Sequence, residues 1–254
     1  MSIQTFDTKY GYVSILENDV YIAREFKNGK YWDENTLLLL RDHIDPNKNI
    51  IEVGAHVGTS SIVYSSFLNP DSKLYAFEPQ RKLFQLLVRN IYQNNLQNQI
   101  VPYNSAVFCV AGKAHLNAVD LDGGGGIVAR RYTDESHLNC NFGGIGLGDG
   151  GEDCCVLTID SLNLPNIGFI HVDAQGAENW ILYGGIGTIR KFKPVILFED
   201  NQNHARILYN TVFYNYPQYA TEGLFNVVDF CVNQLGYRAV FPRFNGSIDT
   251  LLIP

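Results

Sequence analysis

Short apolar segments that alternate with helical patterns place the strongest constraint on the fold of this chain. "NIIEVG" at residues 49–54 enters a glycine turn, and "GTSSIVYSSFL" continues from it with helical spacing. "KLYAFEP" at 73–79 is followed in the same way by an amphipathic pattern at 80–95. The alternation resumes after residue 167. It predicts a doubly wound α/β domain whose sheet is mostly parallel and covered by helices on both faces.

We expect seven strands in one domain that spans residues 1–254. The strands are expected at 49–54, 73–79, 99–108, 168–173, 194–200, 237–241 and 249–254. Helices are expected at 33–44, 58–68, 80–95, 178–191 and 223–235. The loop between the last two strands is too short for a crossover, so the last strand should be antiparallel.

Two segments depart from the alternation. Residues 1–45 are expected to form a small N-terminal β extension followed by a helix; residues 1–31 indicate two or three short strands, with a hairpin turn expected at Asn28–Gly29. Residues 120–156 contain "DGGGG" and "NFGGIGLGDGGED", too much glycine for a packed element. This insertion is expected to be either a loose surface loop or a mobile lid over the site.

Charge, apolar runs and cysteine spacing indicate which kinds of partner and which cellular compartment to expect. There are 26 acidic residues against 19 basic ones, a net charge of −7, which disfavours binding to nucleic acid. No apolar run is long enough to span a membrane, and the N-terminus lacks the blocks of a signal peptide. Five cysteines without Cys-x-x-Cys spacing indicate free thiols. We expect a cytoplasmic protein with no nucleic-acid or membrane partner; the oligomeric state stays open.

The glycine turn after the first core strand favours a small anionic ligand. Gly54 and Gly58 lie in a strand-to-helix turn, where backbone N–H groups point towards a bound anion. A dinucleotide fingerprint would place glycine where His56 and Thr59 stand. Twenty residues beyond Gly58, Glu78 ends the next strand and can accept hydrogen bonds from ribose hydroxyls. Together these features indicate an adenosine ligand with one carboxylate, namely S-adenosylmethionine.

This interpretation assigns one group of residues to the cofactor; the alternative is two ordinary strand-to-helix turns. The expected contacts come from the two strand ends, the segment after the third strand, and Asp173. They are Glu52, Gly54, Ala55, His56, Gly58, Thr59, Ser60, Glu78, Pro79, Ser105, Ala106 and Asp173.

The segment "FIHVDAQGAENWIL" at 169–182 is an apolar run that ends on a carboxylate. An unpaired buried carboxylate is costly, so stability gives no reason for Asp173 at this position. Ligands bind beyond the carboxyl ends of strands in open α/β sheets. We therefore expect Asp173 at the rim of a ligand crevice. Glu199 and Asp200 end the following strand and should reach the same edge.

Several segments resemble, in order and spacing, the FkbM-type methyltransferases. They are "IIEVGAHVGTSS" (50–61), "YAFEP" (75–79), "LTIDSL" (157–162), "IGFIHVDAQGAENWILYGG" (167–185) and "KPVILFED" (193–200). The resemblance implies the Rossmann-like class I methyltransferase fold, S-adenosylmethionine as cofactor, and hydroxyl groups of sugars or natural products as acceptors. Two residues depart from the family pattern, because His171 stands for the usual lysine and Gln175 for the usual glutamate.

Methyl transfer to an aliphatic hydroxyl needs a base or a metal, because the protonated hydroxyl is a poor nucleophile. Asp173 is the predicted base, and His204 is a second candidate. Asp173, Glu199 and Asp200 could also converge on Mg²⁺ or another divalent cation, which prefers oxygen ligands. Alternatively, Asp173 acts alone and His204 is a solvated surface residue.

The leading hypothesis is an S-adenosylmethionine-dependent O-methyltransferase acting on a hydroxyl of a sugar, glycan or other small molecule. Two alternatives stay open: a methyltransferase directed at nitrogen or carboxyl groups of a small molecule, and an inactive binding module with the same fold.

Overall fold

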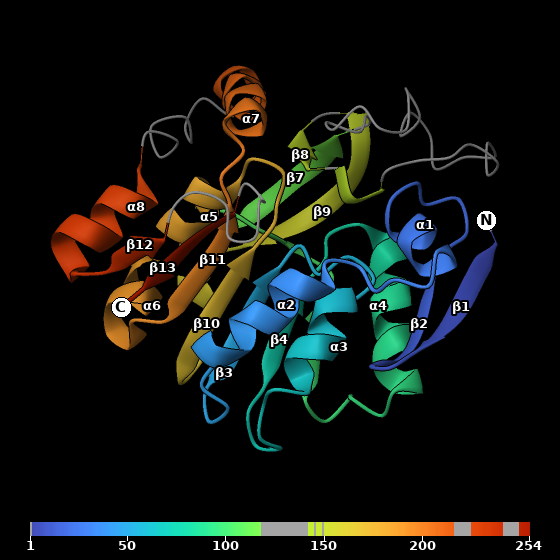
Figure 1. Cartoon of the computed structure of the whole chain (residues 1–254). Helices are drawn as coiled ribbons and strands as arrows, with labels where there is room; N and C mark the ends of the chain where they lie inside the picture. Colours follow the sequence, from blue (N-terminus) through green and yellow to red (C-terminus); the bar gives the residue numbers. More distant parts are fainter. Residues whose placement is uncertain (1, 118–141, 145, 149, 216–224, 241–248) are drawn as a thin grey trace.

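The computed structural model describes residues 2–117, 142–144, 146–148, 150–215, 225–240 and 249–254. Its described part is built around a seven-stranded sheet with the order β12-β13-β11-β10-β3-β4-β5 (Figure 1). Strand β13 is antiparallel to both neighbours, and the other pairs are parallel. The strands are β3 (Asn49–Val53), β4 (Leu74–Phe77), β5 (Ile100–Tyr103), β10 (Ile167–Val172), β11 (Val195–Glu199), β12 (Arg238–Val240) and β13 (Asp249–Ile253). The predicted fold class is confirmed.

Helices cover both faces of this sheet, with α2, α3 and α4 on one side and α5, α6 and α8 on the other (Figure 1). Each face buries its own apolar core. In β3, Ile50 belongs to one core and Ile51 to the other, because successive side chains of a strand point to opposite faces. The helices are α2 (Glu34–Leu40), α3 (Thr59–Ser65), α4 (Arg81–Gln93), α5 (Glu178–Tyr183), α6 (Ile186–Phe192), α7 (Gln202–Asn215) and α8 (Val227–Asp229), with shorter helical turns at Arg41–His43, Phe142–Gly144, Asp160–Leu162 and Phe230–Gln234. Within the described residues, no helix combines the length and apolar character needed to cross a membrane.

The N-terminal segment corrects one expectation. Strands β1 (Ile3–Thr8) and β2 (Gly11–Leu16) form a hairpin, but the next segment is a helix, α1 (Ile22–Lys27). Asp19 precedes this helix, and its Oδ1 accepts hydrogen bonds from the backbone N–H groups of residues 21–23 at 2.6–3.2 Å, which stabilises the start of the helix. Asn28–Gly29 therefore ends a helix rather than turning a hairpin, since a glycine with positive φ serves both purposes.

A second sheet lies beyond the carboxyl end of β5, and it was not predicted. The strand expected at 99–108 stops at Tyr103, and the chain enters a four-stranded sheet with the order β6-β9-β7-β8. Its strands are β6 (Ala106–Val107), β7 (Gly112–Asn117), β8 (Leu147–Gly148) and β9 (Gly150–Leu157). The expectation that 120–156 holds no packed element is wrong for β8 and β9, because Cys154 and Val156 bury alternate side chains. Residues 118–141 of the insertion lie outside the described residues.

Asn90 of α4 and Asn94, the residue just after this helix, hold the outer edge of the N-terminal hairpin. Asn90 is fully buried; its amide accepts from Ser14 N (2.7 Å) and donates to Ser14 O (2.9 Å) and Val57 O (2.7 Å). Asn94 makes the same paired contacts with Tyr12, at 2.7 Å each, nearer to solvent. These side chains supply the hydrogen bonds that a neighbouring strand would give. Through Val57, Asn90 also fixes the loop after β3.

We predict that Asn90→Ala lowers the free energy of unfolding by about 2–4 kcal/mol, because several buried backbone groups lose their partners and each costs about 1–3 kcal/mol. Asn94→Ala is the matched control, and its effect should be smaller because water can replace the lost contacts. Urea denaturation followed by circular dichroism measures both. Equal losses in the two variants would contradict the role given to Asn90.

Candidate functional site

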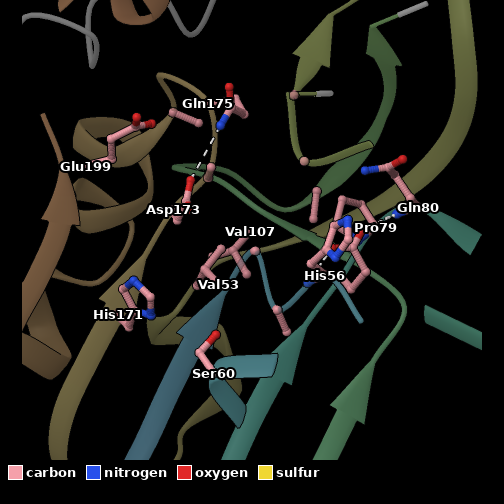
Figure 2. Close-up of a pocket in the computed structure, with 18 of the residues that line it drawn as sticks. Val53, His56, Ser60, Pro79, Gln80, Val107, His171, Asp173, Gln175 and Glu199 are labelled. Atoms are coloured by element: carbon pink, nitrogen blue, oxygen red, sulfur yellow. Dashed lines mark hydrogen bonds between the residues drawn. The ribbon is translucent and has the colours of Figure 1, made fainter. Parts of the chain in front are cut away.

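A cavity of about 340 Å³ lies at the carboxyl ends of the central strands. It is lined by the ends of β3, β4, β10 and β11, by the segment that enters the second sheet, and by parts of the N-terminal segment (Figure 2). Its size falls within the range of small-molecule sites. Most residues predicted to contact the cofactor line it: Gly54, Ala55, His56, Thr59, Ser60, Glu78, Pro79, Ser105, Ala106 and Asp173.

The turn after β3 and the end of β10 are in direct backbone contact. Asp173 N donates to Val53 O at 3.0 Å, and Gly54 N donates to Phe77 O at 3.0 Å. Gly54 has φ +87°, and a Cβ atom there would lie 1.8 Å from Asp173 O. Only a residue without a side chain fits this approach. The glycine bend and the Asp173 tip therefore share one rim, as the sequence predicted.

Glu78 is buried at the end of β4 and braces the glycine turn. Its two carboxylate oxygens accept from His56 N (2.9 Å) and Gln80 N (2.8 Å). Burial raises the pKa of Glu78 to about 8, although both of these hydrogen bonds act to lower it. Each carboxylate oxygen retains a second lone pair. Glu78 can therefore also accept ribose hydroxyls, and the cavity fits the adenosine part of S-adenosylmethionine.

Two of the predicted cofactor residues lie behind the turn and do not line the cavity. Glu52 is buried, accepts a hydrogen bond from Ser61 Oγ, and so fixes the start of α3. Burial raises the pKa of its carboxyl to about 7. A Cβ at Gly58 would lie 2.7 Å from Leu87 Cδ1, so this glycine is needed for packing of α4. Both residues support the turn, and their predicted contact with the cofactor stays a prediction.

His56 lines the cavity in a left-handed conformation, with φ +52°. Its Nε2 lies 3.9 Å from Oδ2 of Asp19, which precedes α1. Burial lowers the pKa of the imidazole, and the Asp19 carboxylate opposes this effect. Tyr21 and Ile22, which follow Asp19, also line the cavity. The sequence analysis missed these N-terminal contributions because no local motif connects them to the glycine turn.

The carboxylates expected to bind a metal do not assemble. Asp173 and Glu199 line the cavity, but Asp200 does not, since adjacent residues at a strand end point in different directions. No group of three or more His, Cys, Asp or Glu side chains among the described residues is arranged to hold a metal ion. The arrangement therefore gives no support to the predicted Asp173–Glu199–Asp200 cation site.

His204 is also displaced from its predicted role. It is buried rather than solvated and does not line the cavity. Its backbone packs against Gly176, where a Cβ would lie 2.5 Å from the His204 carbonyl carbon. This close packing holds the turn after Asp173. The structure therefore gives no support to His204 as the base, and this role stays a prediction.

The turn after Asp173 carries two further polar residues. Glu178 Oε1 accepts from Ala174 N (3.0 Å) and Gly176 N (3.1 Å), so this carboxylate braces the turn. Burial raises the pKa of Glu178 to about 7. Gln175 lines the cavity with φ +55°, and its Nε2 lies 3.5 Å from Asp173 Oδ1 (Figure 2).

His171, two residues before Asp173, lines the cavity and is uncharged. Its Nδ1 lies 3.2 Å from the hydroxyl of Tyr64, and the two rings meet edge to face. Burial lowers the pKa of His171 to about 4, so the imidazole is uncharged at neutral pH. The departure from lysine at this position therefore removes a positive charge from the site.

Comparison with known protein families shows which family this chain belongs to. A family model described as the methyltransferase FkbM domain matches residues 52–239, which is more than half of the chain. The chain belongs to the FkbM methyltransferase family. This match confirms the resemblance, and the methyltransferase family to which the chain belongs is the one that the sequence predicted.

Solved structures agree at the level of the fold. The chain is similar to the methyltransferase FkbM from Methylobacillus flagellatus KT, with 14% identity, a TM-score of 0.52, and coverage of 82% of this chain and 44% of that one. It is also similar to an O-methyltransferase from Bacillus cereus in complex with S-adenosylhomocysteine, with 15% identity, a TM-score of 0.45, and coverage of 87% and 80%. The chain described here spans less than half the length of the Methylobacillus flagellatus protein. A comparison with curated proteins gives no match.

We predict that Gly54→Ala lowers affinity for S-adenosylhomocysteine at least tenfold and lowers the melting temperature, because the new methyl group collides with the backbone of Asp173. Gly29→Ala is the matched control, since φ is +73° but no atom lies within 4 Å of the added Cβ. Its cost should be backbone strain of about 1–2 kcal/mol without loss of binding. Calorimetric titration and thermal melts measure both variants, and unchanged binding in Gly54→Ala would contradict the proposed contact.

The buried glutamates predict a pH dependence of stability. Glu52, Glu78 and Glu178 have pKa values raised by burial to about 7, 8 and 7, from 4.5. Between pH 4.5 and 8 the folded state therefore holds more protons than the unfolded state, and its stability falls as pH rises. We expect the melting temperature of the ligand-free protein to fall across this window, and less steeply in Glu78→Gln. Glu17→Gln, at an exposed carboxylate, should retain the wild-type slope. Parallel slopes in all three proteins would refute the assignment.

Proposed function

We propose that this enzyme transfers a methyl group from S-adenosylmethionine to a hydroxyl group of a sugar, glycan or other small molecule. The observation that carries the proposal is the contact between the glycine turn and Asp173, which puts a carboxylate beside the cofactor half of one cavity. S-adenosylmethionine supplies an electrophilic methyl group on a sulfonium. The protein has to align the acceptor and receive its proton.

Asp173 is suited to receive that proton. It ends β10 on the ligand side of the sheet, and it is exposed to the cavity rather than buried among apolar groups. The amide of Gln175 approaches one carboxylate oxygen at 3.5 Å and can keep the other directed at the acceptor. The backbone of Asp173 is fixed by its hydrogen bond to Val53 O. A hydroxyl placed against this carboxylate loses its proton as it attacks the methyl group.

Asp173→Asn should lower the turnover number at least a hundredfold, in line with the loss of a general base. Affinity for S-adenosylhomocysteine should change little, because the substituted side chain keeps its size. Asp71→Asn, at an exposed loop position, is the control and should keep full activity. Transfer of a labelled methyl group to a panel of glycosides measures turnover, and calorimetry measures binding. Full turnover in Asp173→Asn would refute the assignment, and failure of wild-type protein to bind S-adenosylhomocysteine would refute the function.

A further inference from the structure

Tyr64 of α3 is fully buried, and its hydroxyl meets His171 of β10. Its ring packs edge to face against the rings of Phe169 and His171. The hydroxyl oxygen lies 3.2 Å from His171 Nδ1, and it has no other hydrogen-bond partner among the described residues. Burial above all, together with nearby carboxylates, raises the pKa of Tyr64 well above its usual value. The phenol therefore keeps its proton at neutral pH, and this proton needs an acceptor.

This contact determines which nitrogen of His171 carries the ring proton. Burial lowers the pKa of His171 to about 4, so the imidazole is neutral and has one donor nitrogen and one acceptor nitrogen. A proton on Nδ1 would face the hydroxyl proton of Tyr64 and would leave a buried donor unpaired, which is costly. Tyr64 therefore donates to Nδ1, and the ring proton of His171 is on Nε2.

The Nε2 atom of His171 is open to the cavity that this residue lines. Among the described residues, Nε2 has no hydrogen-bond partner, and it is not one of the buried side-chain atoms that lack one. Both ring nitrogens of His56, by contrast, are buried without a partner. The imidazole of His171 therefore offers the cavity a neutral N–H donor, at the position where the family pattern has a lysine.

The amino-acid arm of the cofactor is the part that reaches this donor. With its ribose hydroxyls at Glu78, the cofactor has its adenosine at the end of β4, and its arm extends across the glycine turn after β3 towards β10, since these strands are neighbours in this order. His171 and Ser60 lie together on the opposite side of Val53 from Pro79, the residue after Glu78 (Figure 2). The arm ends in a carboxylate, which accepts strong hydrogen bonds from N–H groups.

We propose that His171 donates a hydrogen bond from Nε2–H to the carboxylate of bound S-adenosylmethionine, and that Tyr64 is the positioning residue that fixes this tautomer. The inference rests on the cofactor of the proposed function and requires no particular acceptor. Tyr64 does not line the cavity, so it acts only through the ring of His171. The donor holds the carboxylate without the charge that a lysine would bring.

The tautomer can be read directly in the ligand-free protein by long-range proton–nitrogen NMR of uniformly ¹⁵N-labelled samples. We expect a protonated Nε2 and an unprotonated Nδ1 in His171, whose signals are identified by their loss in His171→Gln. Tyr64→Phe keeps the ring but removes the hydroxyl, and it should give a mixture of both tautomers. Tyr92→Phe, at an exposed tyrosine, is the control and should leave the signals unchanged. A proton on Nδ1 in the wild type, or an unchanged tautomer in Tyr64→Phe, would overturn the role of Tyr64.

The contact with the carboxylate is tested by calorimetry with two ligands. S-adenosylhomocysteine has the amino-acid arm, whereas 5′-methylthioadenosine has the adenosine and the sulfur but lacks the arm. His171→Leu removes the donor and should lower affinity for S-adenosylhomocysteine about tenfold or more, the scale of a hydrogen bond to a charged group, with little change for 5′-methylthioadenosine. His171→Gln places an amide N–H near the position of Nε2, so it should keep affinity for S-adenosylhomocysteine within about threefold of the wild type.

The two ligands separate a lost contact from a damaged fold. An unchanged affinity for S-adenosylhomocysteine in His171→Leu would overturn the inference, and so would an equal loss of affinity for both ligands. Either result leaves the proposed function intact as long as the wild type binds S-adenosylhomocysteine. A wild-type protein that binds neither ligand would refute the proposed function and this contact together.

Discussion

The close approach of Gly54 to the backbone of Asp173 is the constraint on which the whole site depends. Strands β3 and β10 pair in parallel up to Val53 and Val172, and both chains then leave the sheet in tight turns. Because Gly54 has no side chain, its backbone can stay against the backbone of Asp173 just beyond the ends of the two strands. A side chain there would push the end of β10 away from the end of β3. It would thereby separate the carboxylate of Asp173 from the glycine loop after β3.

Buried glutamates hold these turns at the expense of stability near neutral pH. Glu78 ties the loop after β3 to the segment after β4, Glu178 closes the turn after β10, and Glu52 fixes the start of α3. Each carboxylate gains hydrogen bonds, yet burial dominates and raises its pKa. A fold selected only for stability would place apolar or smaller residues here. The carboxylates instead fix backbone N–H groups around the ligand, a typical compromise at functional sites.

The sequence predicted the parts of the molecule that local periodicity determines. The central strands, their covering helices and the rim shared by Gly54 and Asp173 follow from apolar spacing and from the rule that ligands bind at strand ends. Long-range packing decided the rest. Nothing local shows that His204 would pack its backbone against Gly176, or that Glu199 would line the cavity without Asp200. Glycine content likewise concealed β9, whose alternating buried residues are the signal that could have revealed it.

The residues that line the cavity fall into two groups, those inside and those outside the range that matches the family. The FkbM match covers residues 52–239, which includes the glycine turn, Glu78 and Asp173. Trp32, Asp33 and Asp249 lie outside that range but line the same cavity, so membership of the family says nothing about them. Two contacts hold the N-terminal segment in place. Asn90 of α4 forms hydrogen bonds with Ser14 in β2, and Asp19 lies close to His56. The cavity therefore combines residues of the matched domain with residues of segments outside it.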